Sequence, residues 1–332
     1  GSASGPGTFD APYNTFANAQ TAANPGDTIH LKAGTYAAIT VSKNGVTVEG
    51  DGQISTKISS SDVAAANAVT VSGENVTLRK LWIEQLNVER NGIYCANVIG
   101  LTIEDCDIDG AYDGVYAVSS VGLRMRRCQV YAIYDGFTVV SAKNFLAEQS
   151  EIVVDGLYDS VGSGSPLTLS YHGVKGDQGS TGALVDCTVL NTRSGACSGE
   201  TIGVSSGHTI GTSYSSIRII NTPITVKVTN ASATGGAYGL KPRNADSTEA
   251  TLADIQGGEI LVSNAGSGGA IPIAASVTGS FVRIAGCKYT ATACTGTSNI
   301  EEVPWSTTPG RSLDITATGE AGIDWANVGS PT

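Results

Sequence analysis

Apolar residues alternate with polar or small residues along most of the chain, in short runs that end at Gly or Asn. From Gly92 onward this pattern repeats. The segments beginning at Gly92, Gly114, Gly136 and Gly173 each place an apolar pair around a small residue fourteen positions later. An apolar period of two is typical of strands, and a repeat of about 22 residues is too short for a helix pair. The pattern therefore predicts coils of short strands.

A single coil cannot bury its own apolar side, so successive coils must stack, pair their backbones in parallel and enclose a continuous core. The sequence thus predicts an all-β solenoid of about 9–10 coils. The chain contains seven cysteines. Four of them occupy the equivalent inward position of different coils, and we expect a ladder of reduced, buried thiols there. These four are Cys106, Cys128, Cys187 and Cys287.

The N-terminal stretch differs from the repeats. Asn14 can cap a short helix with Phe16, Ala19 and Ala23 on one apolar face, and this helix would cover the open end of the first coil. We expect four regions along the chain. They are residues 1–7 as a tag or disordered segment, 8–30 as the N-terminal cap, 31–300 as the β-helix, and 301–332 as a C-terminal cap and the start of a linker.

The segment PGDTIHLKAGTY (residues 25–36), followed by GVTVEGDG (residues 45–52), resembles the first coil of pectate-lyase-like proteins. With the coil repeats, this resemblance covers roughly residues 8–300 and implies a right-handed parallel β-helix. That superfamily includes polysaccharide lyases, glycoside hydrolases, epimerases, phage tailspikes and adhesins. The chain carries no polygalacturonase aspartate motif and no pectate-lyase signature, so the resemblance assigns no catalytic residue.

The charge balance narrows the expected partners. Basic residues number 19 and acidic residues 30, for a net charge of −11, and no basic stripe is present that would track phosphates. We therefore expect no nucleic-acid partner. No apolar run reaches the ~18 residues of a membrane span. The resemblance implies a polysaccharide or cell-surface glycan as partner, an extracellular or virion-associated location, and a homotrimer if the protein derives from a phage.

The residues directly before three repeat glycines suggest a catalytic site. They are Asp113, Asp135 and His172, and each follows a tyrosine. Stacking would place them about 4.8 Å apart, so the two carboxylates could not both ionise easily. One would then serve as an acid and the other as a base or nucleophile. Alternatively, Asp-Gly pairs only shape the corners of the coils. The three preceding tyrosines are candidate sugar platforms: Tyr112, Tyr134 and Tyr171.

Two further groups extend this site. Lys175 and Lys241 each stand two places after a coil glycine, with Arg243 two places beyond Lys241. These cations could anchor an acidic substrate, or they could be isolated and solvated. A second, acidic group follows Glu104 and is a candidate calcium site, the only cofactor that the sequence suggests. It consists of Asp105, Asp107 and Asp109. Ion pairs with Arg126 and Arg127 of the next coil are the alternative.

Two functions follow from these observations. The first is a glycoside hydrolase or lyase that cleaves a polysaccharide bound along the solenoid groove. In it, Asp113 and Asp135 carry the chemistry and His172 orients them or shuttles protons. The second is a non-catalytic glycan-binding or structural module of a phage fibre, tailspike or adhesin.

Overall fold

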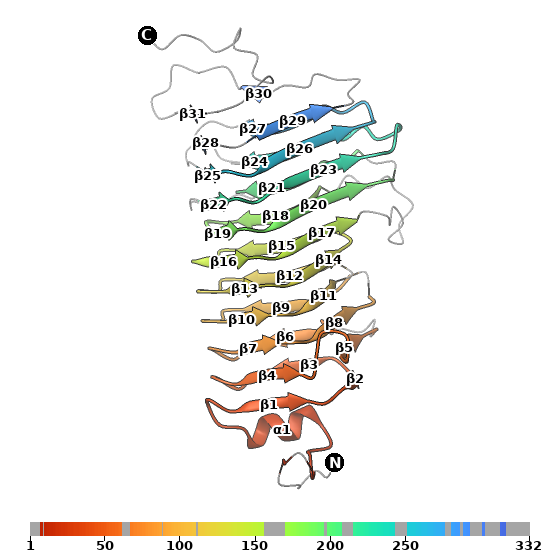
Figure 1. The fold of residues 1–332 in the computed structure, drawn as a ribbon, viewed down its shortest axis with the longest axis vertical. Helices are drawn as coiled ribbons and strands as arrows, with labels where there is room; N and C mark the ends of the chain where they lie inside the picture. Colours follow the sequence, from red (N-terminus) through yellow and green to blue (C-terminus); the bar gives the residue numbers. More distant parts are fainter. Residues whose placement is uncertain are drawn as a thin grey trace.

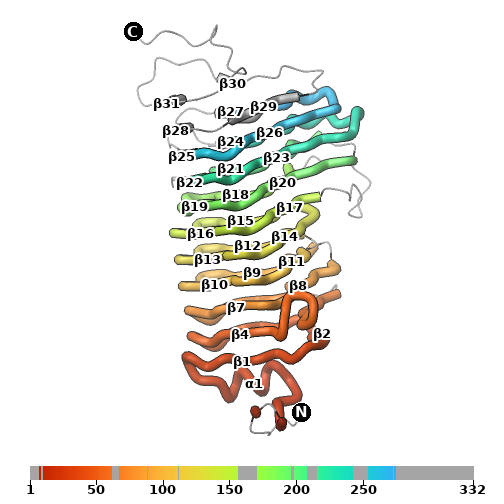
Figure 2. Tube along the Cα trace, in the orientation of Figure 1, coloured from red at the N-terminus to blue at the C-terminus, as the bar shows by residue number. Residues whose placement is uncertain are grey.

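The computed structural model describes residues 7–8, 10–61, 67–87, 89–110, 112–155, 170–195, 198–207, 215–242, 251–275, 280–285, 288–292, 301–302 and 313–316. In this part of the chain, a short helix is followed by strands that wind into a right-handed parallel β-helix (Figure 1). The coils rise in sequence order from α1 at the N-terminal end (Figure 2). The predicted fold class is confirmed.

Each coil contributes one strand to each of three parallel sheets. The first sheet contains β1 (Thr28–Leu31), β4 (Thr47–Gly50), β7 (Thr77–Arg79), β10 (Thr102–Glu104), β13 (Arg124–Arg126), β16 (Phe145–Glu148), β19 (Thr181–Val185), β22 (Ser216–Ile220), β25 (Thr251–Gln256), β28 (Ser280–Ala285) and β31 (Leu313–Thr316). The second contains β2 (Gly34–Tyr36), β5 (Thr56–Ser60), β8 (Trp82–Gln85), β11 (Asp107–Gly110), β14 (Gln129–Ala132), β17 (Glu151–Asp155), β20 (Thr188–Arg193), β23 (Ile224–Val228), β26 (Glu259–Asn264) and β29 (Lys288–Thr292). The third contains β3 (Ile39–Val41), β6 (Val69–Val71), β9 (Ile93–Ala96), β12 (Asp113–Val118), β15 (Asp135–Val140), β18 (Tyr171–Asp177), β21 (Thr201–Ser206), β24 (Ala237–Pro242), β27 (Ala270–Ala275) and β30 (Glu301–Glu302).

Stacked aliphatic ladders fill the interior. One ladder on the second sheet runs through Ile58, Ile83, Ile108, Val130 and Ile152, all fully buried and in register. β-Branched side chains suit this position because they pack tightly on a pleated surface. Cysteines fill smaller spaces, and four buried free thiols are described. They are Cys95, Cys106, Cys128 and Cys187; Cys287 lies outside the described residues.

The repeat glycines stack at the corner where the second sheet passes into the third. A Cβ atom on Gly114 would lie 2.2 Å from Val130 Cγ1 and 2.6 Å from the carbonyl oxygen of Gly136. A Cβ atom on Gly136 would likewise lie 2.6 Å from the carbonyl oxygen of Gly173. The corner is therefore too tight for any side chain, and the register predicted from the glycines is confirmed.

The first coil is closed by the cap helix α1 (Phe16–Ala22). Its N-cap is Thr15, whose hydroxyl accepts from the Asn18 amide, so the expectation of Asn14 as N-cap is wrong by one residue. The Asn14 side chain instead bonds the side chain of Asn18. Phe16 packs against the core, as the apolar face of the helix predicts.

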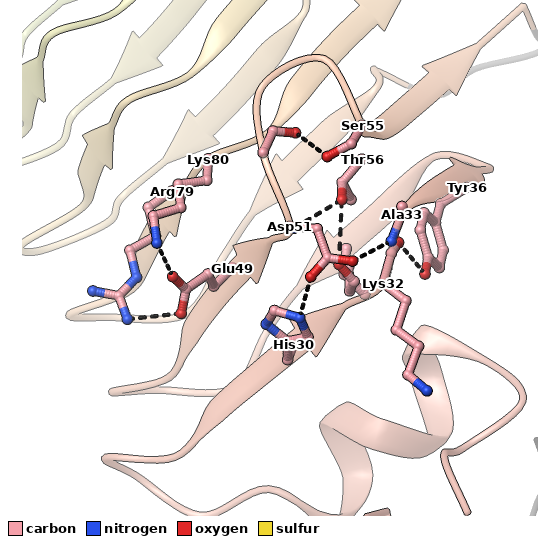
Figure 3. A network of polar contacts seen from close by, with 12 residues as sticks. His30, Lys32, Ala33, Tyr36, Glu49, Asp51, Ser55, Thr56, Arg79 and Lys80 are labelled. Carbon is pink, nitrogen blue, oxygen red and sulfur yellow. Dashed lines mark hydrogen bonds and ion pairs between the residues drawn. The ribbon is translucent and has the colours of Figure 1, made fainter. Parts of the chain in front are cut away.

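Side-chain bonds tie the first coils together (Figure 3). The Asp51 carboxylate accepts from the Ala33 amide at 2.6 Å and lies 2.7 Å from His30 Nε2. One coil further on, Glu49 pairs with Arg79 and Lys80 at 2.8 and 2.7 Å. These bonds supplement the backbone pairing close to the end of the solenoid, where β1 has a strand neighbour on one side only.

The glycine corner generates a stability prediction. A methyl group at Gly136 would collide with Ile152 Cγ2 at 2.4 Å and with a backbone oxygen at 2.6 Å. We expect Gly136→Ala to lower the free energy of unfolding by about 1–3 kcal/mol. Gly52→Ala is the control, because its Cβ would meet only the Ser55 hydroxyl, at 3.0 Å. Thermal unfolding measures both, and equal midpoints for the two variants would contradict the stacked corner.

Candidate active site

The parallel register brings the predicted acid residues together. Asp113 of β12 is the direct partner of Asp135 of β15, and Asp135 is the direct partner of His172 of β18. Each residue immediately precedes a corner glycine. Because a Cβ on Gly114 would point at the core, the preceding side chain projects to the outer side of the sheet. The predicted stack is therefore present on the outside of the solenoid.

Burial of this stack differs from expectation. A catalytic pair that acts on a glycan in the solenoid groove should reach solvent, but Asp113 is 2% exposed and Asp135 and His172 are each 1% exposed. The expectation that these side chains line an open groove is therefore wrong.

Asp135 is the best-bonded member of the stack. Its Oδ1 accepts from the His172 amide at 2.8 Å and lies 2.9 Å from His172 Nδ1. Its Oδ2 lies 3.4 Å from the Thr138 hydroxyl and 3.8 Å from Lys175 Nζ. Both oxygens of Asp135 therefore have a hydrogen-bond donor, and Lys175 lies near Oδ2.

Asp113 has the opposite surroundings. Its Oδ1 is buried and has no hydrogen-bond partner among the described residues. Burial is the main reason why the pKa of Asp113 lies well above its usual range, and the negative charge of Asp135 raises it further. The positive charge of Lys175 partly opposes this rise. The two carboxyl groups therefore have different surroundings, one with an unbonded buried oxygen and a raised pKa and the other with hydrogen bonds to both oxygens.

The predicted tyrosine ladder is present but packs into the wall. The Tyr112 and Tyr134 rings stack with centroids 4.6 Å apart, and Tyr134 meets Tyr171 edge-on at 5.1 Å. Burial raises the pKa of Tyr112 to about 12. The Arg193 guanidinium lies 3.9 Å above the Tyr171 ring and covers it. Tyr171, only 4% exposed, is therefore not an open platform for a sugar ring.

Arg193 is a residue that the sequence analysis missed. It is 1% exposed, and none of its three guanidinium nitrogens has a hydrogen-bond partner among the described residues. Its contact with the Tyr171 ring is a cation–π interaction, which strengthens when the cation is desolvated. The signal was available, because the alternation in TVLNTR (residues 188–193) places a charged residue at an inward position.

The two candidate lysines share one register position. Lys175 pairs with Ser205, and Ser205 pairs with Lys241, so the lysines lie two strands apart in one row of the third sheet. Lys175 contacts Asp135, as described above. Lys241 Nζ binds the Glu200 carboxylate and lies 3.8 Å from the Tyr238 ring centre. Arg243 lies outside the described residues.

The acidic cluster is divided by a turn. Asp105 adopts a left-handed conformation (φ 50°) before β11, and its carboxylate binds Arg127 at 2.6 and 2.8 Å. Asp107 and Asp109 lie on β11, where burial raises the pKa of each. Within the described part of the chain, no three His, Cys, Asp or Glu side chains are placed to hold a metal ion. Calcium binding stays a prediction, and the alternative ion pair with Arg127 is present.

Known proteins share this architecture. Residues 35–165 match a family model described as a right handed beta helix region. Pectin methylesterase from Yersinia enterocolitica superposes with a TM-score of 0.50 at 12% identity, over 70% of this chain and 92% of that protein. Pectate lyase Pel9A superposes with a TM-score of 0.50 at 14% identity, over 92% and 77% of the two chains. The Dettilon tailspike protein gives 0.47 at 14% identity, over 83% and 57%.

No curated protein sequence matches the chain. The chain resembles the pectate-lyase-like class of right-handed parallel β-helix proteins, and the resemblance is one of fold. In addition, none of the helices in the described residues is long and apolar enough to cross a membrane.

The raised pKa of Asp113 generates a pH prediction. Because the folded-state pKa lies above the unfolded value of about 3.9, the folded state binds this proton more tightly. Asp113 therefore contributes fully to stability below the unfolded-state pKa of about 3.9, and this contribution is lost as the pH rises towards the folded-state pKa. Asn cannot ionise. We therefore expect the difference in thermal midpoint, Asp113→Asn minus wild type, to increase from about pH 5 to about pH 8.

Asp105→Asn is the matched control for this measurement. Arg127 lowers the pKa of Asp105, so this carboxylate is fully ionised in both states over the same pH window. Its difference from wild type should stay constant with pH. A constant difference for Asp113→Asn as well would contradict the raised pKa of Asp113.

Proposed function

We propose that this protein is a carbohydrate-active enzyme that cleaves a polysaccharide, with Asp113 and Asp135 as its catalytic pair. The observation that carries the proposal is the contrast between their surroundings. Asp113 has a buried oxygen without a hydrogen-bond partner among the described residues and a raised pKa, whereas Asp135 accepts from His172 and lies beside Lys175. A protonated acid next to a stabilised carboxylate is the arrangement that glycoside hydrolysis uses.

The spacing of the pair favours hydrolysis with retention. Residues directly opposite on parallel strands lie about 4.8 Å apart, near the ~5–5.5 Å between the carboxyl groups of retaining glycosidases. Asp113 would protonate the glycosidic oxygen as the bond breaks, while Asp135 forms the glycosyl ester on the other side of the sugar. Asp113, now ionised, would then take a proton from the water that hydrolyses this ester. His172 would hold Asp135 in position.

Elimination by a lyase receives less support from the same contacts. A lyase needs a cation to neutralise the uronate carboxylate beside the abstracted proton. Lys175 lies 3.8 Å from Asp135, and Lys241 binds Glu200, so a substrate carboxylate would compete with these carboxylates. Both lysines remain candidate substrate anchors.

One observation favours a second function, a non-catalytic glycan-binding or structural module of a phage fibre, tailspike or adhesin. Asp113, Asp135 and His172 are at most 2% exposed, as expected for a polar ladder that only shapes a corner. For catalysis, a sugar must displace neighbouring side chains to reach Asp113. In both functions the partner is a polysaccharide or cell-surface glycan, and the setting is extracellular or virion-associated. A homotrimer would fit a phage origin.

Asp135→Asn tests the enzyme directly. We expect it to reduce product formation on the order of 100-fold or more, because the amide cannot act as nucleophile or base. The thermal midpoint should stay within a few degrees of wild type, since Asn keeps the shape of the side chain. Wild type and variant are incubated with a panel of neutral and acidic polysaccharides, and reducing ends and unsaturated products are measured.

Glu151→Gln is the matched control, because Glu151 lies on β17, away from the stack, and undergoes the same acid-to-amide change. It should retain full activity. Product formation by wild type that Asp135→Asn leaves intact would remove Asp135 from the mechanism. Binding to a glycan without any product would support the non-catalytic module instead.

A further inference from the structure

Thr138 is a buried hydroxyl that the acid/base chemistry above does not use. It lies on β15, three residues after Asp135, and is 1% exposed. Its row on the third sheet is occupied by Tyr116 on one side and Lys175 on the other. Strict alternation would put residues three apart on opposite faces, but the corner glycine interrupts it, and the Asp135 carboxylate meets both Thr138 and Lys175.

The hydroxyl is placed between the two carboxyl groups. Thr138 Oγ1 lies 3.4 Å from Asp135 Oδ2, the oxygen that also faces Lys175. The same hydroxyl acts on Asp113, and it opposes the effects of burial and of Asp135 on that group. A hydroxyl has one proton to donate, so it can hydrogen-bond to only one ionised carboxylate at a time.

We propose that Thr138 is a positioning residue, which donates its hydroxyl proton to the ionised carboxylates of the pair, to Asp135 Oδ2 in this structure, and so limits how tightly the pair holds its acid proton. This inference rests on the proposed function and adds a residue to it. With Oδ1 bound by His172 and Oδ2 by Thr138, both oxygens of Asp135 accept hydrogen bonds. Asp113 could then donate its proton towards a substrate.

Other titratable groups surround Asp113 and must stay constant in a test. In its own coil, Tyr112 directly precedes Asp113 and Tyr116 lies on the same strand. The next coil contributes Tyr134 and Asp135. The coil after that contributes His172 and Lys175. On the preceding coil, the Arg90 carbonyl accepts from the Tyr112 amide. None of these residues is changed when Thr138 is replaced by Val, which keeps the shape of the side chain and removes only the hydroxyl.

The experiment compares Thr138→Val with Thr138→Ser in the full chain. Carboxyl groups are labelled with carbon-13 in aspartate, and the Asp113 signal is assigned by its loss in Asp113→Asn. Because the Thr138 hydroxyl lowers the pKa of Asp113, we expect the valine variant to raise that pKa further, by about one unit. The serine variant, which restores a hydroxyl, should stay within a few tenths of wild type. Thr138→Ala serves as the second hydroxyl-free variant if valine does not fold.

Activity gives a second, separate readout. If Asp113 is the acid, the alkaline limb of the pH profile of kcat/KM should move upward in the valine variant with the same shift as its NMR titration. An unchanged Asp113 titration in both hydroxyl-free variants overturns the role of Thr138, whether or not glycan is cleaved. A shifted titration without any glycan cleavage by wild type supports Thr138 as the positioning group and rejects the enzyme.

Discussion

The parallel hydrogen-bond register between successive coils determines every feature of this molecule. It sets neighbouring rungs about 4.8 Å apart and makes direct neighbours of residues that are far apart in the chain. Asp113 and Asp135 meet across one coil of 22 residues, while Asp135 and His172 meet across 37. The glycine corner enforces this register, because each glycine lies against the carbonyl oxygen of the next one and tolerates no side chain.

The same constraint explains why the acid pair is asymmetric. An isolated corner aspartate on an outer face could stay solvated, but two on adjacent rungs must share a small and poorly hydrated space. Within the described structure, the two members of the pair differ in their hydrogen-bond partners. Asp135 accepts from His172 on one oxygen, and Thr138 and Lys175 face the other, while Asp113 keeps a buried oxygen without a hydrogen bond in the described structure.

The sequence patterns predicted those features that depend on the repeat period and on the register of the strands. The β-helix, the glycine stack, the acid ladder, the tyrosine ladder and the common row of Lys175 and Lys241 all follow from aligning the repeats. The burial of Asp113, Asp135 and His172 could not be predicted from this alignment, because it depends on how the side chains of neighbouring coils pack against one another. Thr138 was accessible to the same alignment, as it stands in the row of Lys175, but its role depends on the side-chain geometry between rungs.

Turn conformation limited the prediction of the acidic cluster. Strict alternation would place Asp105 on one strand with Asp107 and Asp109, whereas Asp105 has a left-handed backbone and lies in the turn between β10 and β11. Asp105 therefore faces Arg127, which occupies the equivalent left-handed turn of the following coil. A strict alternation rule fails at such a corner, since one residue with positive φ changes the direction of the chain.

Because burial raises the pKa of Asp113 well above its usual range, we propose that Asp113 and Asp135 together hold one proton near neutral pH and that this proton resides on Asp113. Infrared difference spectroscopy at neutral pH measures this proton most directly, because a protonated carboxyl group has a carbonyl stretch well separated from that of a carboxylate. We expect a protonated-carboxyl band in wild type that disappears in Asp113→Asn. A wild-type spectrum without that band, or a band that persists in Asp113→Asn, would contradict it.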